Sequence, residues 1–315
     1  MTAWLLCGLG LLILLLAGDA LVRGAVNVSL RLGVPALIVS LTIVAFGTSA
    51  PELLVAIKAV QENAPGIALG NVVGSNTANV LLVMGIPALL TVIHTSHCDS
   101  RKTYLQMLAA SVLFIALAWF GTFTWISGAL LLAALAYVLH DMFRDAQAHR
   151  RAGEADELEI IEEADPDMPW WRIFVYLLLG LVGLPLGANL LVENATVIAQ
   201  IYGVSDEVIG LTLVAVGTSL PELATSVMAA LRRHAEVALG NVIGSNLFNL
   251  LGIVGVATLF GPIAVDPEFL RRDLWVMLAT SLLLIPFVFF KRDITRTWGV
   301  LLTGLYLVYL VAVLS

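Results

Sequence analysis

Residues 44–54, VAFGTSAPELL, place a helix breaker and a carboxylate inside strongly apolar sequence. Within six positions this segment carries Gly47, Thr48, Ser49, Pro51 and Glu52. Pro51 has no N–H, and its ring clashes with the carbonyl of Gly47, so a helix should kink or break here. Carbonyls freed in lipid need a new partner, and a bound cation is one. The Thr48 and Ser49 hydroxyls would lie near Glu52, because residues three and four apart share a helix face.

The same chemistry returns 170 residues later. LTIVAFGTSAPELLVAI at 41–57 matches LTLVAVGTSLPELATSV at 211–227, and GNVVGSNTAN matches GNVIGSNLFN at the same offset. Between 42–85 and 212–255, 21 of 44 positions are identical without a gap, which indicates an internal duplication. The duplicated oxygen donors are Glu52 and Glu222, Thr48 and Thr218, Ser49 and Ser219, Ser75 and Ser245, Asn76 and Asn246, Asn79 and Asn249, and the backbone oxygens of Ala45 and Ala215. The helix-breaking residues are Gly47, Pro51, Gly217 and Pro221.

The donor set points to a site for a hard cation. All of these groups are oxygens and none is a sulfur or an imidazole, which favours Na⁺, Ca²⁺ or Mg²⁺ over zinc or copper. Glu52 and Glu222 lie well inside apolar spans, where a carboxylate is costly and usually functional. No Lys or Arg lies at a comparable depth in the sequence. One Ca²⁺ would balance the two negative charges, and Na⁺ or protons would balance them differently.

Composition places the chain in a membrane. Of its 315 residues, 60% are hydrophobic and only 12% are charged, and the mean hydropathy is +0.97. A soluble surface needs about twice that charged fraction. No GxSxG, HExxH or P-loop motif supports an enzyme, and no basic patch interleaved with aromatics supports nucleic-acid binding. The distant Cys7 and Cys98 form no disulfide framework.

Ten apolar spans are long enough to cross a bilayer. They lie near 3–22, 34–60, 67–93, 104–121, 124–143, 172–200, 207–231, 236–261, 273–290 and 297–314. We therefore expect an all-α polytopic membrane protein with a first five-helix repeat at 1–143, an acidic linker at 144–171 and a second repeat at 172–315. Because five is odd, the second repeat must enter the membrane from the opposite side, which is the inverted-topology plan of many secondary transporters.

Basic residues predict the orientation of the chain. When the loops are numbered alternately, 13 of the 16 Lys and Arg residues fall on one side. The positive-inside rule places that side in the cytoplasm. Both termini would then lie outside, and the acidic linker would lie in the cytoplasm.

Other small and polar residues have a structural interpretation. Gly70 with Gly74, and Gly240 with Gly244, form GxxxG spacings that predict close helix packing. Asp19 ends the first predicted span, and Glu193 lies in the sixth. Either carboxylate could line an access path, but we favour interfacial anchoring.

The two paired motifs are similar to those of a known protein family. The paired motifs GTSAPE…GNVVGSNTAN and GTSLPE…GNVIGSNLFN resemble the α-1 and α-2 repeats of the sodium/calcium exchanger family, within the cation/calcium antiporter superfamily. The resemblance is strongest over 38–90 and 208–260. The chain is similar to the compact prokaryotic members, which lack the large calcium-sensing domains of animal exchangers.

The resemblance implies a function and a set of ligands. It implies a Ca²⁺/Na⁺ antiporter, not an enzyme, in a bacterial inner membrane, with the transported ions but no cofactor, nucleic acid or obligate protein partner. It implies central carboxylates at Glu52 and Glu222, and overlapping sites at which Na⁺ and Ca²⁺ compete at the membrane midplane. The further ligands that it implies are Thr48, Ser49, Thr218, Ser219, Ser75, Ser245 and Asn79, with backbone oxygens at Ala45 and Ala215. It also implies that spans one and six slide against the core to alternate access.

Asn249 leaves alternatives open for the coupling ion and for the function. Some relatives, including potassium-dependent exchangers, have aspartate at this position, whereas both halves here have asparagine. The site then holds two carboxylates, which argues against potassium co-transport and leaves Na⁺ against H⁺ as coupling ion unsettled. A proton-coupled calcium or divalent-cation antiporter with the same site is the main alternative. A passive cation channel or a non-transporting calcium sensor is a further one.

Overall fold

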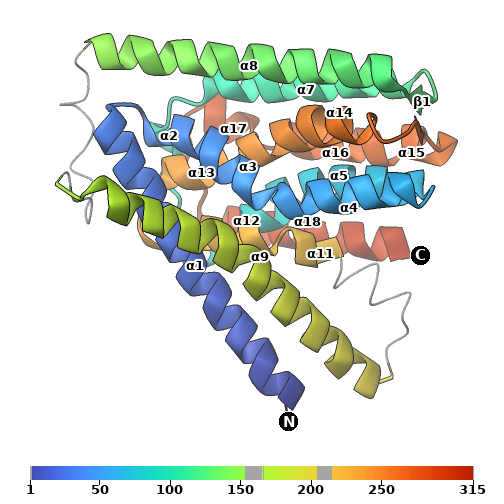
Figure 1. Ribbon diagram of the computed structural model, residues 1–315, viewed down its shortest axis with the longest axis horizontal. Helices are drawn as coiled ribbons and strands as arrows, with labels where there is room; N and C mark the ends of the chain where they lie inside the picture. The colour runs from blue at the N-terminus through green and yellow to red at the C-terminus, as the bar shows by residue number, and fades with distance from the viewer. Residues whose placement is uncertain (1, 153–164, 166, 204–214, 315) are drawn as a thin grey trace.

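The computed structural model describes residues 2–152, 165, 167–203 and 215–314. These residues form an all-helical protein (Figure 1). The first half contains α1 (Thr2–Leu32), α2 (Ala36–Val39), η1 (Ser40–Val44), α3 (Ala45–Thr48), α4 (Ala50–Gln61), α5 (Pro65–Ala78), η2 (Asn79–Val83), α6 (Gly85–Leu90), η3 (Thr95–His97), α7 (Arg101–Ala118), β1 (Thr122–Phe123) and α8 (Trp125–Ala152). The second half contains α9 (Trp170–Ile201), α11 (Ala215–Thr218), α12 (Leu220–Leu231), α13 (Ala235–Leu247), η6 (Phe248–Ile253), α14 (Val254–Ala257), β2 (Ile263–Ala264), α15 (Pro267–Arg271), α16 (Asp273–Leu282), α17 (Ile285–Phe289) and α18 (Arg296–Leu314).

Seven helical stretches among the described residues are long and apolar enough to cross a membrane. They are Thr2–Leu32, Pro65–Leu90, Trp125–Ala148, Trp170–Ile201, Ala235–Ala257, Pro267–Phe289 and Arg296–Val313. The bent pair Ala36–Thr48 and Ala50–Gln61 makes an eighth if it is one span. The predicted span at 104–121 corresponds to α7, and the one at 207–231 lies partly outside the described residues.

Two helices with the duplicated GNxxGSN sequence form the centre of the molecule. Every residue of α13 from Val237 to Leu247 is buried, as are most residues of α5 from Ala68 onward. Together with the segments that follow them, η2 and η6, they contribute to the largest apolar core. Their low content of charged residues fits this position, since a helix that is apolar on all sides is a buried one.

The outer surface is apolar. Large side chains such as Leu16, Phe120, Phe174 and Leu307 are more than half exposed. Contiguous exposed apolar surface on this scale marks a face that contacts lipid, because soluble monomers rarely carry it. The protein is therefore a multi-pass membrane protein.

The fifth helix is longer than predicted. We expected the linker to start at 144, but α8 continues to Ala152 and α9 begins at Trp170. The extension is rich in Arg, Gln and Ala, which are good helix formers and let the helix leave the apolar layer without a break. The remaining linker residues, 153–164 and 166, lie outside the described residues.

Short backbone pairings tie the loops of the two halves together. Thr122 pairs with Ala264, and Phe123 pairs with Ile263, in an antiparallel two-stranded sheet. An isolated antiparallel bridge joins Ile93 to Ile294. Ile93 and Ile263 are 170 residues apart, so the two pairings occupy equivalent positions of the duplication.

Two long helices stand apart from the others. In Figure 1, α1 and α9 run side by side and slant away from the block formed by the remaining helices. In Figure 1, the end of α8 and the start of α9 lie at the left, whereas the end of α18 lies at the right and the start of α1 at the bottom. The block holds the central helices, and α1 and α9 cover one of its faces.

Candidate ion-binding site

The predicted breaks lie at two equivalent serines. Ser49 separates α3 from α4 with φ −85° and ψ 5°, and Ser219 separates α11 from α12 with φ −88° and ψ 4°. The helix axis bends by 44° at the first break. Pro51 and Pro221 lie in the first turn of the helix that follows, where a missing N–H costs no intrahelical bond.

The break frees fewer carbonyls than expected. The Ala45 carbonyl accepts the Ser49 N–H at 3.0 Å and the Thr48 hydroxyl at 3.3 Å. The Ala45 carbonyl therefore keeps its helical bond, and the carbonyl that faces a proline is that of Gly47. In the second half, the Ser219 N–H bonds to the carbonyl of Val216 at 3.0 Å.

The two carboxylates at the start of α4 and α12 are fully inside the protein. The exposed fraction of Glu52 is 0% and that of Glu222 is 1%. Neither forms an ion pair with a basic residue within the described part of the chain. In that part, both Oε atoms of Glu52 and Oε2 of Glu222 also lack a hydrogen-bond partner. Buried acceptors without donors leave room for a ligand that supplies positive charge.

Two asparagines present further unpaired oxygens, at positions equivalent under the duplication. Asn79 donates through Nδ2 to Asn246 Oδ1 at 3.1 Å, and Asn249 donates to Asn76 Oδ1 at 3.0 Å. These bonds use the amide N–H groups, and the Oδ1 atoms of Asn79 and Asn249 have no partner among the described residues. The Asn76 and Asn246 side chains also bond to each other's backbone carbonyl, at 3.3 and 3.5 Å. The cross-linked amides thus hold two acceptors in place.

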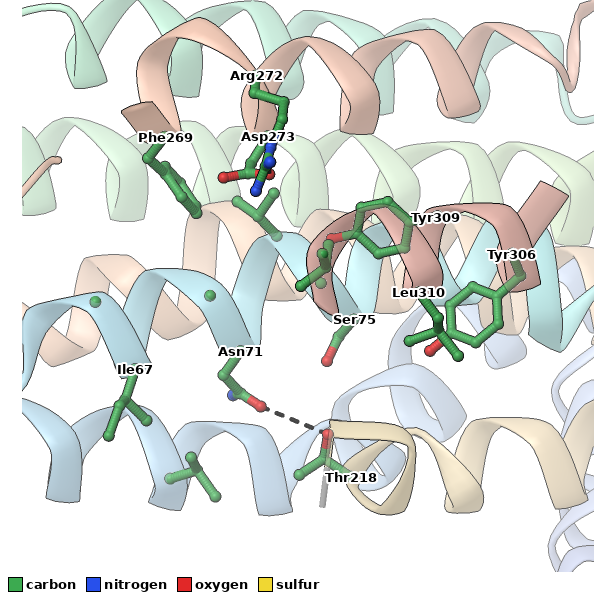
Figure 2. A pocket seen from close by; sticks show the side chains of 16 residues that line it. Ile67, Asn71, Ser75, Thr218, Phe269, Arg272, Asp273, Tyr306, Tyr309 and Leu310 are labelled. Carbon is green, nitrogen blue, oxygen red and sulfur yellow. Dashed lines mark hydrogen bonds and ion pairs between the residues drawn. The ribbon is translucent and has the colours of Figure 1, made fainter. Parts of the chain in front are cut away.

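The predicted hydroxyl ligands reach across the two halves. Ser49 donates to Glu222 Oε1 at 3.2 Å. Thr48 contacts Asn241 Oδ1 at 3.3 Å and Ser245 Oγ at 3.5 Å. Thr218 donates to Asn71 Oδ1 at 3.5 Å (Figure 2). The two breaks therefore meet each other and the central helices, as one site would require.

Two residues of the site were missed by the sequence interpretation. Asn71 Nδ2 donates to the Glu52 carbonyl at 3.2 Å, and Asn241 Nδ2 donates to the Glu222 carbonyl at 3.1 Å and to Ser226 Oγ at 3.0 Å. Each asparagine thus fixes the turn that carries the carboxylate of its own half and bonds the threonine of the other half. The signal was present, because both Asn residues follow the repeated glycine at an offset of 170.

Irregular helical turns occur at the same places. The segments η1, η2 and η6 are π-helical, and η2 begins at Asn79 while η6 contains Asn249. Single π-helical turns shift the register of the helix and are frequent at functional sites. The sequence interpretation did not predict them.

A cavity of about 440 Å³ reaches the site from one side. Its lining includes Ile67, Asn71 and Ser75 of α5 and Thr218 of α11, together with Arg272 between α15 and α16 and Tyr309 of α18 (Figure 2). In Figure 2, Ser75 and Asn71 point from α5 into this space. Ser75 lines this cavity although it is only 3% exposed, and its equivalent, Ser245, is fully buried.

The GxxxG glycines behave differently in the two halves. A Cβ built on Gly244 would lie 2.6 Å from Ala45 Cβ, and one on Gly240 would lie 2.9 Å from Ser40 Cβ. Gly70 and Gly74 instead line the cavity, with no described atom within 4 Å of a Cβ built on either. The packing prediction is confirmed for the second half. For the first half it stays a prediction, because the positions equivalent to Leu37, Ser40 and Leu41 are 207, 210 and 211, outside the described residues.

Comparison with known proteins gives a consistent assignment. The family model described as sodium/calcium exchanger protein matches residues 2–140 and 172–315. The chain is 37% identical over 276 residues to the putative antiporter CaxA of Alkalimonas amylolytica, covering 88% of this chain and 86% of CaxA. It is 34% identical to the sodium/calcium exchanger MaX1 of Methanosarcina acetivorans, covering 96% of both chains.

Solved structures agree with the sequence relatives. A structure of the sodium-calcium exchanger NCX_Mj soaked with zero Na⁺ and Ca²⁺ superposes with a TM-score of 0.84 at 32% identity. The superposition covers 99% of this chain and 98% of that one. Both the fold and the sequence therefore agree over nearly the whole length.

Proposed function

This chain belongs to the sodium/calcium exchanger family, whose members are transporters and not enzymes, and on that premise we propose that it exchanges Ca²⁺ for Na⁺ across a membrane. The observation that carries the proposal is the set of buried oxygens without a hydrogen donor among the described residues, on Glu52, Glu222, Asn79 and Asn249. These oxygens come in pairs separated by 170 residues. No ordinary structural role accounts for unpaired acceptors at both equivalent positions.

The proposed site neutralises the ion and replaces its water. Glu52 and Glu222 supply two negative charges, and Thr48, Ser49, Ser75 and their equivalents supply neutral oxygens. Ca²⁺ takes about six to eight oxygens at about 2.3–2.6 Å, so it needs carboxylates, hydroxyls and amides together. Na⁺ uses the same kind of donors, so the two ions compete.

The proposed architecture is two inverted five-helix repeats of ten spans. It is supported by the duplication, by the equivalent pairings at Ile93 and Ile263, and by the position of the chain ends. The end of α18 lies at the opposite end of the long axis from the α8 and α9 ends that flank the linker (Figure 1). With the linker in the cytoplasm, as the basic residues predict, the cavity beside Ser75 opens toward the outside. Access would then alternate as the site becomes open to one side at a time.

Ion flux into proteoliposomes tests the proposal. Uptake of ⁴⁵Ca²⁺ is measured in vesicles loaded with Na⁺, in vesicles loaded with choline, and in vesicles with only a pH gradient. We expect uptake that needs the outward Na⁺ gradient and that is lost in Glu52→Gln and in Glu222→Gln. Glu268→Gln, which changes an exposed carboxylate on α15, is the matched control and should retain uptake.

Other outcomes identify the alternatives. Uptake driven by the pH gradient alone would identify H⁺ as the coupling ion in place of Na⁺. Ca²⁺ conduction without any counter-ion gradient would indicate a channel, and binding without flux would indicate a sensor. Full Na⁺-driven exchange in Glu52→Gln or Glu222→Gln would show that the carboxylate replaced in that variant is not part of the site.

A further inference from the structure

The helices α1 and α9 form one mechanical unit. Their backbones touch at glycines: a Cβ built on Gly10 would lie 2.7 Å from Leu191 N, and one on Gly180 would lie 2.8 Å from Leu21 Cα. Gly10 and Gly180 are equivalent under the offset of 170, and so are Leu21 and Leu191. The pair is thus internally symmetric and closely packed, and it slants away from the other helices (Figure 1).

The contact of this pair with the rest of the protein is not symmetric. On α1, Val22 and Val26 form a buried cluster with Ala229 of α12 and Val237 of α13. A Cβ built on Gly18 would lie 3.0 Å from the Ala224 carbonyl oxygen. Equivalent packing would join α9 to α4, but the described parts of these two helices make few contacts and share no such buried cluster. One of two equivalent interfaces is therefore formed.

An ion pair joins the two sides of the interface between α1 and α12. Arg232, directly after α12, contacts the Asp19 carboxylate on α1. Arg23 donates to the other oxygen of Asp19 at 3.0 Å. The side chains of Arg232 and Asp19 are only 14% and 21% exposed. Asp19 is thus more than the interfacial anchor that we expected, because it connects α1 to the residue that follows α12.

The duplication does not repeat this ion pair, since Asp19 and Arg232 correspond to Asn189 and Glu62, but it places an acid and a base about one helical turn from those two positions. The positions equivalent to Arg23 and Met228 are Glu193 on α9 and Lys58 on α4. Lys58 is 76% exposed and lies 3.8 Å from Glu62. Glu193 is exposed and makes no ion pair with any residue that the structure describes. An acid on α9 and a base on α4 are therefore both outside any ion pair between the two helices in this conformation.

We propose that Asp19 with Arg232, and Glu193 with Lys58, are alternating latches that each stabilise one of the two access states. This proposal rests on the proposed exchange function, because it assigns residues that position the helices during alternation. In the conformation described here, the Asp19 latch holds α1 against α12 and the cavity is open on the opposite side. Movement of α1 and α9 toward α4 breaks that latch and brings Glu193 to Lys58.

Hydrogen–deuterium exchange on the full-length protein in nanodiscs, without Ca²⁺, tests the latches. Asp19→Asn should raise deuterium uptake at 226–240 and lower it at 56–66, and Glu193→Gln should change uptake in the opposite directions. The population ratio of the two states should shift about threefold to tenfold, as expected for a partly exposed charge pair. Asp141→Asn is the matched control, since Asp141 is 20% exposed in its ion pair with Lys102 and lies outside the interface.

A charge exchange separates the latch from general damage. Asp19→Arg combined with Arg232→Asp keeps one acid between two bases, because Arg23 is still present. We expect the combined variant to show the wild-type pattern of deuterium uptake. Each single charge reversal should lose that pattern. The proposal is overturned if Asp19→Asn behaves like the Asp141→Asn control or if the combined variant fails to recover. Because the experiment needs no ion flux, its failure is distinct from a failure of Na⁺-driven Ca²⁺ uptake.

Discussion

Ser49 of the first half donates a hydrogen bond to Glu222 of the second half at 3.2 Å, across 173 residues of sequence. Ser219, the equivalent of Ser49, has no partner for its hydroxyl among the described residues. The equivalent serine hydroxyls of the two motifs therefore differ in their hydrogen bonds. In this conformation the Glu222 carboxylate is oriented from the opposite repeat, and the Glu52 carboxylate is not.

This asymmetry predicts unequal effects of serine removal. Ser49→Ala deletes a bond to a charged group, so the Ca²⁺ concentration for half-maximal uptake should rise about tenfold, which corresponds to about 1.4 kcal/mol. Ser219→Ala removes an unpaired hydroxyl and should have a smaller effect. Concentration-dependent ⁴⁵Ca²⁺ uptake measures both. Ser29→Ala, which removes a buried hydroxyl bonded only within its own helix, should leave the value unchanged; equal effects of Ser49→Ala and Ser219→Ala would contradict the assignment.

The asparagine that fixes the Glu222 turn should matter for stability as well as for transport. Asn241→Ala removes the two bonds that the buried amide donates, to the Glu222 carbonyl and to the Ser226 hydroxyl. The free energy of unfolding should fall by about 2–4 kcal/mol. Asn71→Ala should cost less stability, since Asn71 is only partly buried and lines the cavity. Thermal unfolding in detergent, followed by Ca²⁺ uptake for the folded variants, distinguishes the two, and a larger loss for Asn71→Ala would oppose this interpretation.

Two glycines with the same local sequence should respond oppositely to a methyl group. Gly244→Ala places Cβ 2.6 Å from Ala45 Cβ and 2.7 Å from the Leu41 carbonyl oxygen, so overpacking should cost about 1–3 kcal/mol. Gly74→Ala meets no described atom within 4 Å, and alanine favours a helix over glycine by about 0.5–1 kcal/mol. The apparent Tm should therefore fall in the first variant and stay constant or rise in the second. Similar losses in both would mean that the cavity beside Gly74 is filled.

A histidine in the loop between α12 and α13 should make stability depend on pH. Burial, and then the nearby charge of Arg232, lower the pKa of His234 from 6.5 to about 4. The unfolded chain therefore binds a proton that the folded protein refuses between these values. Stability should be fully present above pH 6.5 and should decrease as the pH falls from 6.5 toward 4.

The measurement is the apparent Tm against pH for the wild type and for His234→Gln. Glutamine is neutral at every pH in this range, so the variant should lose part of the slope while matching the wild type's shape above pH 6.5. Parallel curves over the whole range would show that His234 is not the titrating group.

Much of the site could be predicted because its causes are local. A proline without an N–H, a carboxylate in apolar sequence and a gap-free duplication are properties of the chain itself. They predicted the breaks near Ser49 and Ser219, and the burial and pairing of equivalent oxygens on Glu52, Glu222, Asn79 and Asn249. They did not predict the free or occupied state of an individual carbonyl, because that depends on whether the helix resumes, as it does for the Ala45 carbonyl.

Hydrogen-bond partners far apart in the chain could not be predicted from the sequence. The bonds of Asn79 to Asn246 and of Ser49 to Glu222 join residues 167 and 173 positions apart, and no local propensity specifies which side chains meet. Asn71 and Asn241 were overlooked for a related reason. Their role is to bond a backbone carbonyl on another helix, and that becomes visible only when the helices are packed.

By itself, the sequence determined a membrane protein made of two related halves, with two carboxylates at equivalent helix breaks and oxygen donors around them. Only the tertiary structure decided which half is open. Gly74 and Gly244 have the same neighbours in sequence, yet one lines a cavity and the other is packed against Ala45. The slanted α1 likewise packs against α12, whereas α9 makes few contacts with α4. A duplicated sequence specifies both contacts alike, and a single conformation can form only one of them.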